Sequence, residues 1–219
     1  MERFNTFASI KDRAVEGRDF TVEVRHGTSG FAIMAPHGGG IEWGTDIIAG
    51  AIAGSNHGYY TFKGLLPRGN RGLHLTSLRF DEPRALPLIR KCHTIITVHG
   101  CRGEKPVVYA GGLDRALKDS IADTLVHRHF TVKKHPPAAL KGVDPHNLCN
   151  RGLRGKGVQL ELSFGLRRQL FDGSFRTGMF RNIRFMRFVE AMRRVLYDHR
   201  GTVVFGPMAS GFHRGDDFL

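Results

Sequence analysis

A histidine and a glutamate flank a run of three glycines in the stretch "FAIMAPHGGGIEWGTDIIAGAIAG" (31–54). These residues, His37 and Glu42, follow an apolar run typical of a buried strand, and His99 ends a second such run, "HTIITVHG". Two histidines and a carboxylate are protein ligands that a catalytic zinc site uses when its fourth position stays open for water. The glycines allow the turn to fold back, so that His37 and Glu42 face one ion. The sequence therefore predicts a zinc site formed by His37, Glu42 and His99.

A second carboxylate, Glu161, lies inside the apolar run "VQLELS". An isolated carboxylate is costly to bury without a partner, and a role as general base beside a metal-bound water would explain its position. A structural ion pair with Arg167 or Arg151 is the alternative explanation. Each histidine taken singly is also explained as a hydrogen-bonded turn residue. The prediction of an active site therefore depends on the joint placement of the four side chains.

The elements that must position these side chains alternate between short β-rich runs and helical patterns, with no repeat and no long linker. We expect strands at 20–25, 31–35, 93–100 and 157–163. We expect one helix capped by Thr45 or Asp46, a short helix that Pro83 opens with Asp81 as its cap, and further helices at 113–130 and at roughly 180–198. In the last helix, the residues expected to point inward are Ile183, Met186, Val189, Ala191, Met192, Val195 and Leu196. This alternation predicts a single-domain three-layer α/β sandwich over residues 1–219, with a mixed, mostly parallel sheet. Ligands of such folds bind beyond the carboxyl ends of the strands, where the candidate residues lie.

The composition points to a polyanionic partner. The 219 residues include 33 Lys and Arg against 20 Asp and Glu, a formal net charge of +13. Nucleic acid, anionic polysaccharide, an acidic peptide polymer or phospholipid headgroups would all satisfy this electrostatic preference. No apolar run approaches the ~20 residues that span a bilayer, and the first residues lack the apolar centre of a secretory signal. Three cysteines without CxxC spacing favour reduced thiols. We therefore expect cytoplasmic synthesis and no membrane partner.

Several segments together resemble a known family. The segments "APHGGGIEWGTDIIAGAIAG", "YYTFKG", "LHLTSLRFDEP", "TVHGC" and "NLCNRG" followed by "GVQLELSFGLR" are similar, in this order, to the poly-gamma-glutamate hydrolases of bacteriophages and bacilli. That resemblance implies a fold similar to the zinc carboxypeptidases, an ion held by His37, Glu42 and His99, and Glu161 as the catalytic base. The four residues between His37 and Glu42 depart from the tighter HxxE spacing of the carboxypeptidases, so geometry taken from those enzymes is approximate.

The resemblance also implies a substrate and a reaction. In the implied reaction, zinc activates a water molecule, Glu161 accepts its proton, and the γ-amide carbonyl of poly-γ-glutamate is attacked. Asn150 and Arg151, in "NRG", resemble an Asn–Arg pair of the carboxypeptidases and are expected to bind a substrate carboxylate; a solvated loop is the alternative. His74 is a further candidate for the site. The basic surface would then steer the anionic polymer toward the enzyme.

Two rival functions belong to other classes. One is a zinc amidohydrolase or deacylase that acts on small N-acyl amino acids. The other is a basic nucleic-acid-binding protein, against which the absence of a helix-turn-helix, zinc-finger or RNP-like pattern counts. Poly-γ-glutamate is found outside cells, whereas we expect this enzyme to be made in the cytoplasm. If the chain is phage-derived, lysis of the host would release the enzyme to its substrate.

Overall fold

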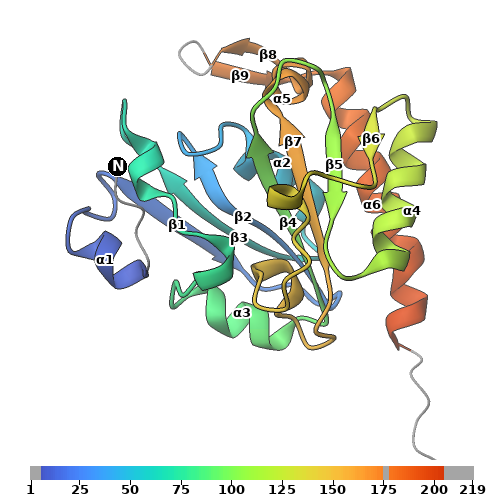
Figure 1. Ribbon diagram of the computed structural model, residues 1–219, viewed down its shortest axis with the longest axis horizontal. Coiled ribbons are helices and arrows are strands. Elements are labelled where there is room, and N and C mark those ends of the chain that lie inside the picture. The colour runs from blue at the N-terminus through green and yellow to red at the C-terminus, as the bar shows by residue number, and fades with distance from the viewer. Residues whose placement is uncertain (1–5, 175–177, 205–219) are drawn as a thin grey trace, which may run out of the picture.

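The computed structural model describes residues 6–174 and 178–204, which build a seven-stranded sheet with helices on both faces (Figure 1). The strand order is β1-β3-β2-β4-β7-β5-β6. Four of the six strand pairings are parallel, and only β1 with β3 and β5 with β7 are antiparallel among the strands of this sheet in the described part of the chain. The predicted three-layer sandwich with a mixed, mostly parallel sheet is confirmed. That residues 1–219 form one domain stays a prediction.

The bounds of the elements agree with most of the sequence prediction. The strands are β1 (Phe20–Arg25), β2 (Phe31–Gly39), β3 (Gly58–Gly64), β4 (Thr94–Cys101), β5 (Val108–Gly111), β6 (Val132–Lys133) and β7 (Val158–Ser163), with a hairpin of β8 (Phe171–Ser174) and β9 (Gly178–Arg181). The helices are α1 (Phe7–Lys11), α2 (Thr45–Ala53), α3 (Ala85–Lys91), α4 (Arg115–His127), α5 (Phe164–Leu170) and α6 (Ile183–Val204). No helix in the described ranges is long and apolar enough to cross a membrane.

Two hydrophobic cores lie on opposite faces of the sheet, because successive residues of a strand point to opposite sides. In β2, Ile33 and Ala35 join the core beneath α2, α4 and α6, while Ala32 and Met34 join the core beneath α1 and α3. The central strands are therefore apolar on both faces, as strands covered on both sides are. A polar side chain in such a strand stands out only where the strand ends.

Two local predictions were wrong. In α6, Ile183 and Met186 are exposed, while Phe185 and Phe188 point into the core, because the larger aromatic side chains determine which face of the helix is buried. Asp81 does not cap α3; its carboxylate accepts a hydrogen bond from the N–H of Phe7 at 2.7 Å.

The next residue along the chain, Glu82, accepts hydrogen bonds from the backbone at the start of α3. The Glu82 carboxylate accepts hydrogen bonds from the N–H groups of Arg84 and Ala85, both at 3.0 Å. A carboxylate at this position satisfies backbone N–H groups that have no partner inside the helix. The sequence pattern therefore placed the start of this helix at Pro83, two residues before Ala85, and chose the wrong one of two neighbouring acidic residues.

The path of the chain creates a crevice at one point of the sheet. From β2 the chain crosses through α2 to β3 on one side, and β4 then pairs with β2 on the other side. The chain thus continues in opposite directions across the sheet from β2, and a crevice forms between the carboxyl ends of β2 and β4. Such a reversal is where open α/β sheets bind their ligands.

Candidate active site

A bulge in β2 turns His37 toward the crevice. The register between β2 and β3 shifts between Ala35 and Gly38, so that an extra residue enters on the β2 side. Pro36 lies in this interval, and it has no N–H group to donate to a neighbouring strand. Bulges next to binding sites commonly re-aim a side chain, and here the bulge carries His37 past the last β2–β4 pair, Met34 with Thr97.

The glycine turn brings Glu42 back to His37. Gly39 has φ of 60°, and a side chain there would collide with the carbonyl oxygen of Gly64. The N–H of Glu42 donates to the carbonyl of His37 at 2.8 Å, which closes the turn. The hydroxyl of Thr45, the first residue of α2, donates to the carbonyl of Glu42 at 2.8 Å. The predicted fold-back of this loop is therefore present.

The third member of the set comes from the neighbouring strand. His99 lies near the end of β4, directly opposite Glu161 on β7. The N–H of Gly100 donates to Oε2 of Glu42 at 2.9 Å, which ties the glutamate to the same strand. Nε2 of His99 lies 3.4 Å from the hydroxyl of Ser77. Three separate chain segments thus converge on one point.

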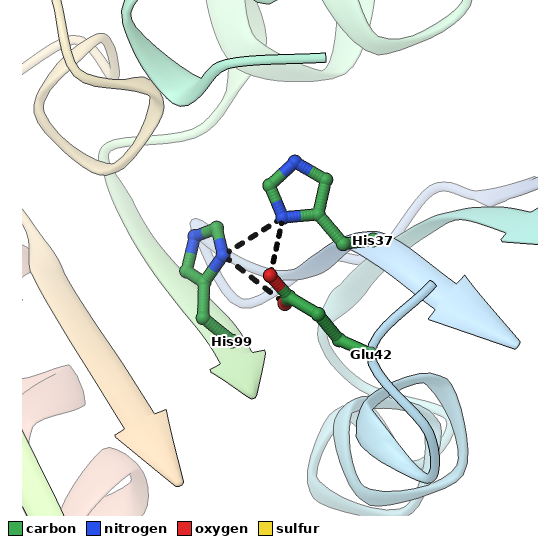
Figure 2. Close-up of side chains that lie close together, drawn as sticks. All are labelled: His37, Glu42 and His99. Carbon is green, nitrogen blue, oxygen red and sulfur yellow. Dashed lines mark hydrogen bonds and ion pairs between the residues drawn. The ribbon is translucent and has the colours of Figure 1, made fainter. Parts of the chain in front are cut away.

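Figure 2 shows that the three side chains face one another. Nδ1 of His37 lies 3.1 Å from Oε1 of Glu42 and 3.1 Å from Nδ1 of His99. Nδ1 of His99 lies 3.5 Å from Oε2 of Glu42. All three donor atoms lie within 4.8 Å of one another, which is close enough for one metal ion.

The donor set fits a zinc ion. Nε2 of His37 lies 2.6 Å from the carbonyl oxygen of Leu75, which can only accept, so Nε2 carries the proton. A neutral His37 ring then presents the lone pair of Nδ1 toward Nδ1 of His99 and the carboxylate of Glu42. The lone pair of His37 and the negative charge of Glu42 repel each other unless a cation or a donated proton lies between them. Two imidazoles and a carboxylate, with one ring fixed by a backbone carbonyl, match a catalytic zinc site.

Charge and burial act on these groups in opposite directions. Burial lowers the pKa of His37, and this effect exceeds the opposing effect of Glu42. Burial alone would raise the pKa of Glu42, but the neighbouring histidines hold that pKa well below its ordinary value. For His99, burial acts to lower the pKa, while the carboxylates of Glu42 and Glu161 raise it above its ordinary value. Glu42 is therefore ionised at neutral pH, as a metal ligand must be.

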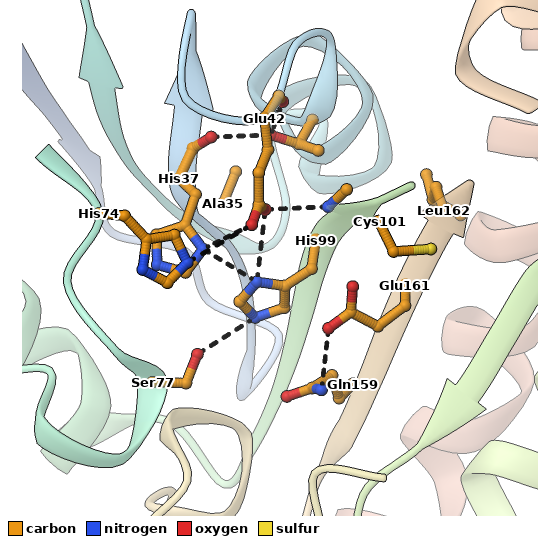
Figure 3. A network of polar contacts seen from close by, with 12 residues as sticks. Ala35, His37, Glu42, His74, Ser77, His99, Cys101, Gln159, Glu161 and Leu162 are labelled. Atoms are coloured by element: carbon orange, nitrogen blue, oxygen red, sulfur yellow. Dashed lines mark hydrogen bonds and ion pairs between the residues drawn. The ribbon is translucent and has the colours of Figure 1, made fainter. Parts of the chain in front are cut away.

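Glu161 lies beside this set without belonging to it (Figure 3). Its side chain is 8% exposed, and burial raises its pKa to about 7. Nε2 of Gln159 donates to Oε1 of Glu161 at 3.1 Å. Among the residues that the structure describes, no ion pair joins Glu161 to Arg167 or Arg151. A carboxyl group with this pKa can both take up and release a proton near neutral pH.

His74 lies against His37 and Glu42, two of the three residues of the candidate metal site, here called the metal set (His37, Glu42 and His99). Its ring stacks on that of His37 with centroids 3.9 Å apart, and its Nε2 lies 3.7 Å from Oε1 of Glu42. The side chain is 34% exposed, so it forms part of the wall between the metal set and solvent.

Two adjoining cavities open onto the site. One of about 630 Å³ contains His37, His99 and Glu161 in its wall, and the other measures about 360 Å³. Both share Glu42, His74, Arg71, Gly100, Cys101 and Arg102. The two arginines were not expected from the sequence, because Arg71 lies in a short 3-10 helix (Asn70–Leu73) and Arg102 in a loop, and neither segment has a periodic pattern. Gln159 also escaped notice, although its position two residues before Glu161 on one strand places both side chains on one face.

Asn150 and Arg151 lie apart from the metal set. The amide of Asn150 accepts from the N–H groups of Leu113 and Gly157 and donates to the carbonyls of Gly142 and Asp144. Its side chain is therefore fully used in holding loops together.

The guanidinium of Arg151 donates to the carbonyl of Phe80 at 2.5 Å. Neither Asn150 nor Arg151 contributes to the walls of the two cavities described above. The structure thus brings His74 to the site and leaves this pair outside it, and substrate binding by Asn150 and Arg151 stays a prediction.

The fold and the site define an α/β sandwich protein with a candidate metal centre at the carboxyl ends of parallel strands. The sequence model described as poly-gamma-glutamate hydrolase matches residues 4–191. The chain belongs to the poly-gamma-glutamate hydrolase family, and the resemblance seen in its motifs is confirmed.

Similar proteins agree with this assignment. The UPF0714 protein YndL of Bacillus subtilis (strain 168) is 34% identical over 200 residues, which cover 88% of this chain and 77% of YndL. A bacteriophage poly-gamma-glutamate hydrolase structure has a TM-score of 0.87 at 28% identity and covers 92% of this chain and 100% of its own. A zinc-free apo structure of YndL has a TM-score of 0.82 at 34% identity, with 90% and 98% coverage. The likeness to zinc carboxypeptidases stays a prediction.

Proposed function

We propose that this protein hydrolyses γ-glutamyl amide bonds of poly-γ-glutamate, with zinc held by His37, Glu42 and His99 and with Glu161 as the general base. The observation that carries the proposal is the convergence of Nδ1 of His37, Nδ1 of His99 and a carboxylate oxygen of Glu42, beside a second carboxyl group that is not in the set. The description of one related structure as zinc-free YndL supports zinc as the metal.

The residues of the chain divide the work of the reaction. When bound, zinc supplies Lewis acidity, which makes water a stronger acid and polarises a carbonyl group. Oε1 of Glu161 is held by Gln159, while its Oε2 has no protein partner in the described part of the chain, so this oxygen accepts the proton of the attacking water. Glu161 then returns the proton to the leaving α-amine. In the metal-free protein, burial raises the pKa of Glu161 to about 7.

The two arginines of the cavity walls supply a site for the substrate's charges. Arg71 and Arg102 line both cavities, and neither forms an ion pair in the described ranges. Poly-γ-glutamate carries one free carboxylate on each residue, and the planar fork of arginine matches a carboxylate. Two adjoining cavities, one of which is lined by His37, Glu42 and His99, leave room for a chain that continues past the scissile bond, which favours a polymer over a small N-acyl amino acid.

The test is to incubate the protein with poly-γ-glutamate and to follow polymer length on a gel, with chelator and with zinc added back. We expect shortening that stops with chelator and returns with zinc. Release of product from an N-acyl glutamate, with no shortening of polymer, would instead support the amidohydrolase alternative. Salt-sensitive binding to DNA without either activity would support the nucleic-acid alternative.

A second experiment tests the arginines. Arg71→Gln and Arg102→Gln should raise KM for polymer by about 10-fold each, the scale of a lost charged contact, with little change in kcat.

Raising salt from ~50 to ~500 mM shortens the Debye length from ~14 to ~4 Å, so polymer turnover by the wild type should fall more than turnover of a short oligomer. Equal sensitivity of polymer and oligomer would contradict long-range steering.

The similarity to a bacteriophage hydrolase supports release on host lysis as the route to the polymer.

A further inference from the structure

Arg167 is a buried arginine with an unusual set of partners. It lies on α5, its side chain is 5% exposed, and its three nitrogens donate to three carbonyl oxygens. Nε donates to Leu162 at 3.2 Å, Nη1 to Trp43 at 2.7 Å and Nη2 to Cys101 at 3.1 Å. In the described part of the chain it forms no ion pair with a carboxylate. Three bonds to neutral oxygens thus replace the hydration that its charge loses.

The three carbonyls belong to the three segments that carry the site. Trp43 follows the metal ligand Glu42, and Leu162 follows Glu161. Cys101 lies two residues beyond His99 on β4. The strands β4 and β7 are already joined by their own ladder, with His99 opposite Glu161. The loop of Glu42 lies outside that ladder, and the shortest of the three bonds reaches this loop.

The packing around Arg167 is as specific as its hydrogen bonds. A Cβ atom at Gly100 would lie 2.6 Å from Cζ of Arg167, so the guanidinium rests directly on the backbone of β4. The N–H of the same Gly100 donates to Oε2 of Glu42. Glycine at position 100 therefore permits Arg167 and Glu42 to approach β4 at one residue.

We propose that Arg167 is a positioning residue, whose guanidinium fixes the loop of Glu42 against β4 and β7 and thereby sets the distance between the metal site and the base Glu161. The effect of Arg167 on kcat rests on the proposed function. Its metal-binding consequence does not depend on what the substrate is.

The geometry of the side chain decides which substitution can replace it. Arginine presents donors in a rigid planar fork, whereas the ammonium group of lysine is a compact charge on a flexible stem. Arg167→Lys keeps the positive charge near Glu42 and Glu161 and cannot reach three carbonyls that lie in different directions. Arg167→Ala removes the fork and leaves a space that guanidinium ions can enter, since Arg167 lines the smaller cavity.

The experiment measures zinc affinity and kinetics on the two variants. Outer partners of metal ligands typically contribute 10- to 100-fold to affinity or activity, so chelator competition should show about 10-fold weaker zinc binding in both. With saturating zinc, kcat should fall by about 10²-fold in Arg167→Ala while KM changes little, because small displacements of reacting groups have that cost. Millimolar guanidinium chloride should restore part of the zinc affinity and kcat of Arg167→Ala, and equal potassium chloride should not.

Arg154→Ala is the matched control. Arg154 donates to Asp114 at 2.8 Å and to Thr94, at the far end of β4 from the site. Its loss should lower the melting temperature, leave zinc affinity and kcat unchanged, and show no guanidinium rescue. Unchanged zinc affinity and kcat in folded Arg167→Lys and Arg167→Ala would overturn the proposal. A raised KM with normal kcat and zinc affinity would also overturn it and make Arg167 a substrate contact.

The proposed hydrolysis of polymer and the positioning role of Arg167 can be tested separately. A wild-type protein that binds zinc and cuts no polymer contradicts the proposed function, and the chelator competition still tests Arg167. A wild type that cuts polymer, with Arg167 variants that bind zinc as tightly and turn over as fast, contradicts the positioning role alone.

Discussion

The carboxyl ends of β2 and β4 and the loop around Asn150 both gather buried polar side chains, and the two regions use them in opposite ways. Each hydrogen-bonding group of the Asn150 amide has a protein partner. At the strand ends, the outer nitrogen of His37 donates to the carbonyl of Leu75. The inner nitrogens of His37 and His99 face each other and Glu42 instead. Buried polar groups that protein atoms satisfy hold structure together, and ligand atoms of several side chains that converge on one point mark a candidate binding site.

The largest expected effect is the loss of the metal. His37→Ala or His99→Ala removes one of three protein ligands, so we expect zinc content to drop from about one ion per chain to near none and activity to disappear. Elemental analysis after gel filtration measures this directly. Full zinc retention by both variants would remove these residues from the metal site and break the contrast between the two regions.

Glu161→Gln separates chemistry from metal binding. The amide keeps the shape of the side chain but cannot accept a proton, so kcat should fall by about 10²-fold or more while zinc stays bound. Glu42→Gln is the matched variant and should weaken zinc binding, because a neutral amide is a poor ligand. A stable, zinc-loaded Glu161→Gln protein with near-normal kcat would exclude Glu161 as the base.

Asn150→Ala tests the other region. The substitution leaves two N–H groups and two carbonyls without their partner, and the free energy of unfolding should fall by about 3 kcal/mol. The kcat of the folded fraction should stay near the wild-type value. A stable variant with a much higher KM would show that Asn150 contacts the substrate, in line with the prediction from the carboxypeptidase resemblance.

The smallest expected effect concerns pH and the metal-free protein. Burial raises the pKa of Glu161 from an ordinary 4.5 to about 7, so the folded state holds this proton more tightly than the unfolded state. The resulting stabilisation is fully present below pH 4.5 and is lost as the pH rises through about 7. Relative to Glu161→Gln, the wild type should therefore lose stability over this interval in urea unfolding at several pH values. If the difference in unfolding free energy between the two proteins does not change with pH, the raised pKa of the buried Glu161 carboxyl group is contradicted.

The sequence predicted the candidate site better than its surroundings. His37, His99 and Glu161 lie in or at the ends of apolar runs, and parallel strands bring such positions to one edge of a sheet. The role of Arg167 was not predictable, because its three partners are backbone carbonyls far apart in the chain. The sequence offered only carboxylates as partners, and an ion pair with Glu161 was the natural expectation.

Helix and cap details failed for local reasons. Along α6, the apolar residues lie on more than one face, and only packing shows that Phe185 and Phe188 are the buried ones. Asp81 and Glu82 are adjacent acids before α3, and the choice between them depends on the contact of Asp81 with Phe7, 74 positions away in the chain. Contacts of this range have no signature in a single sequence.

Anomalous diffraction at the zinc edge, from crystals of the zinc-loaded protein, tests the central claim most directly. We expect one strong peak in the crevice between β2 and β4. It should mark a zinc ion bonded to Nδ1 of His37, Nδ1 of His99 and the carboxylate of Glu42, with Glu161 beside the ion and not bonded to it. A peak at any other place would contradict the account, as would zinc bound through Nε2 of His37 or directly through the carboxylate of Glu161.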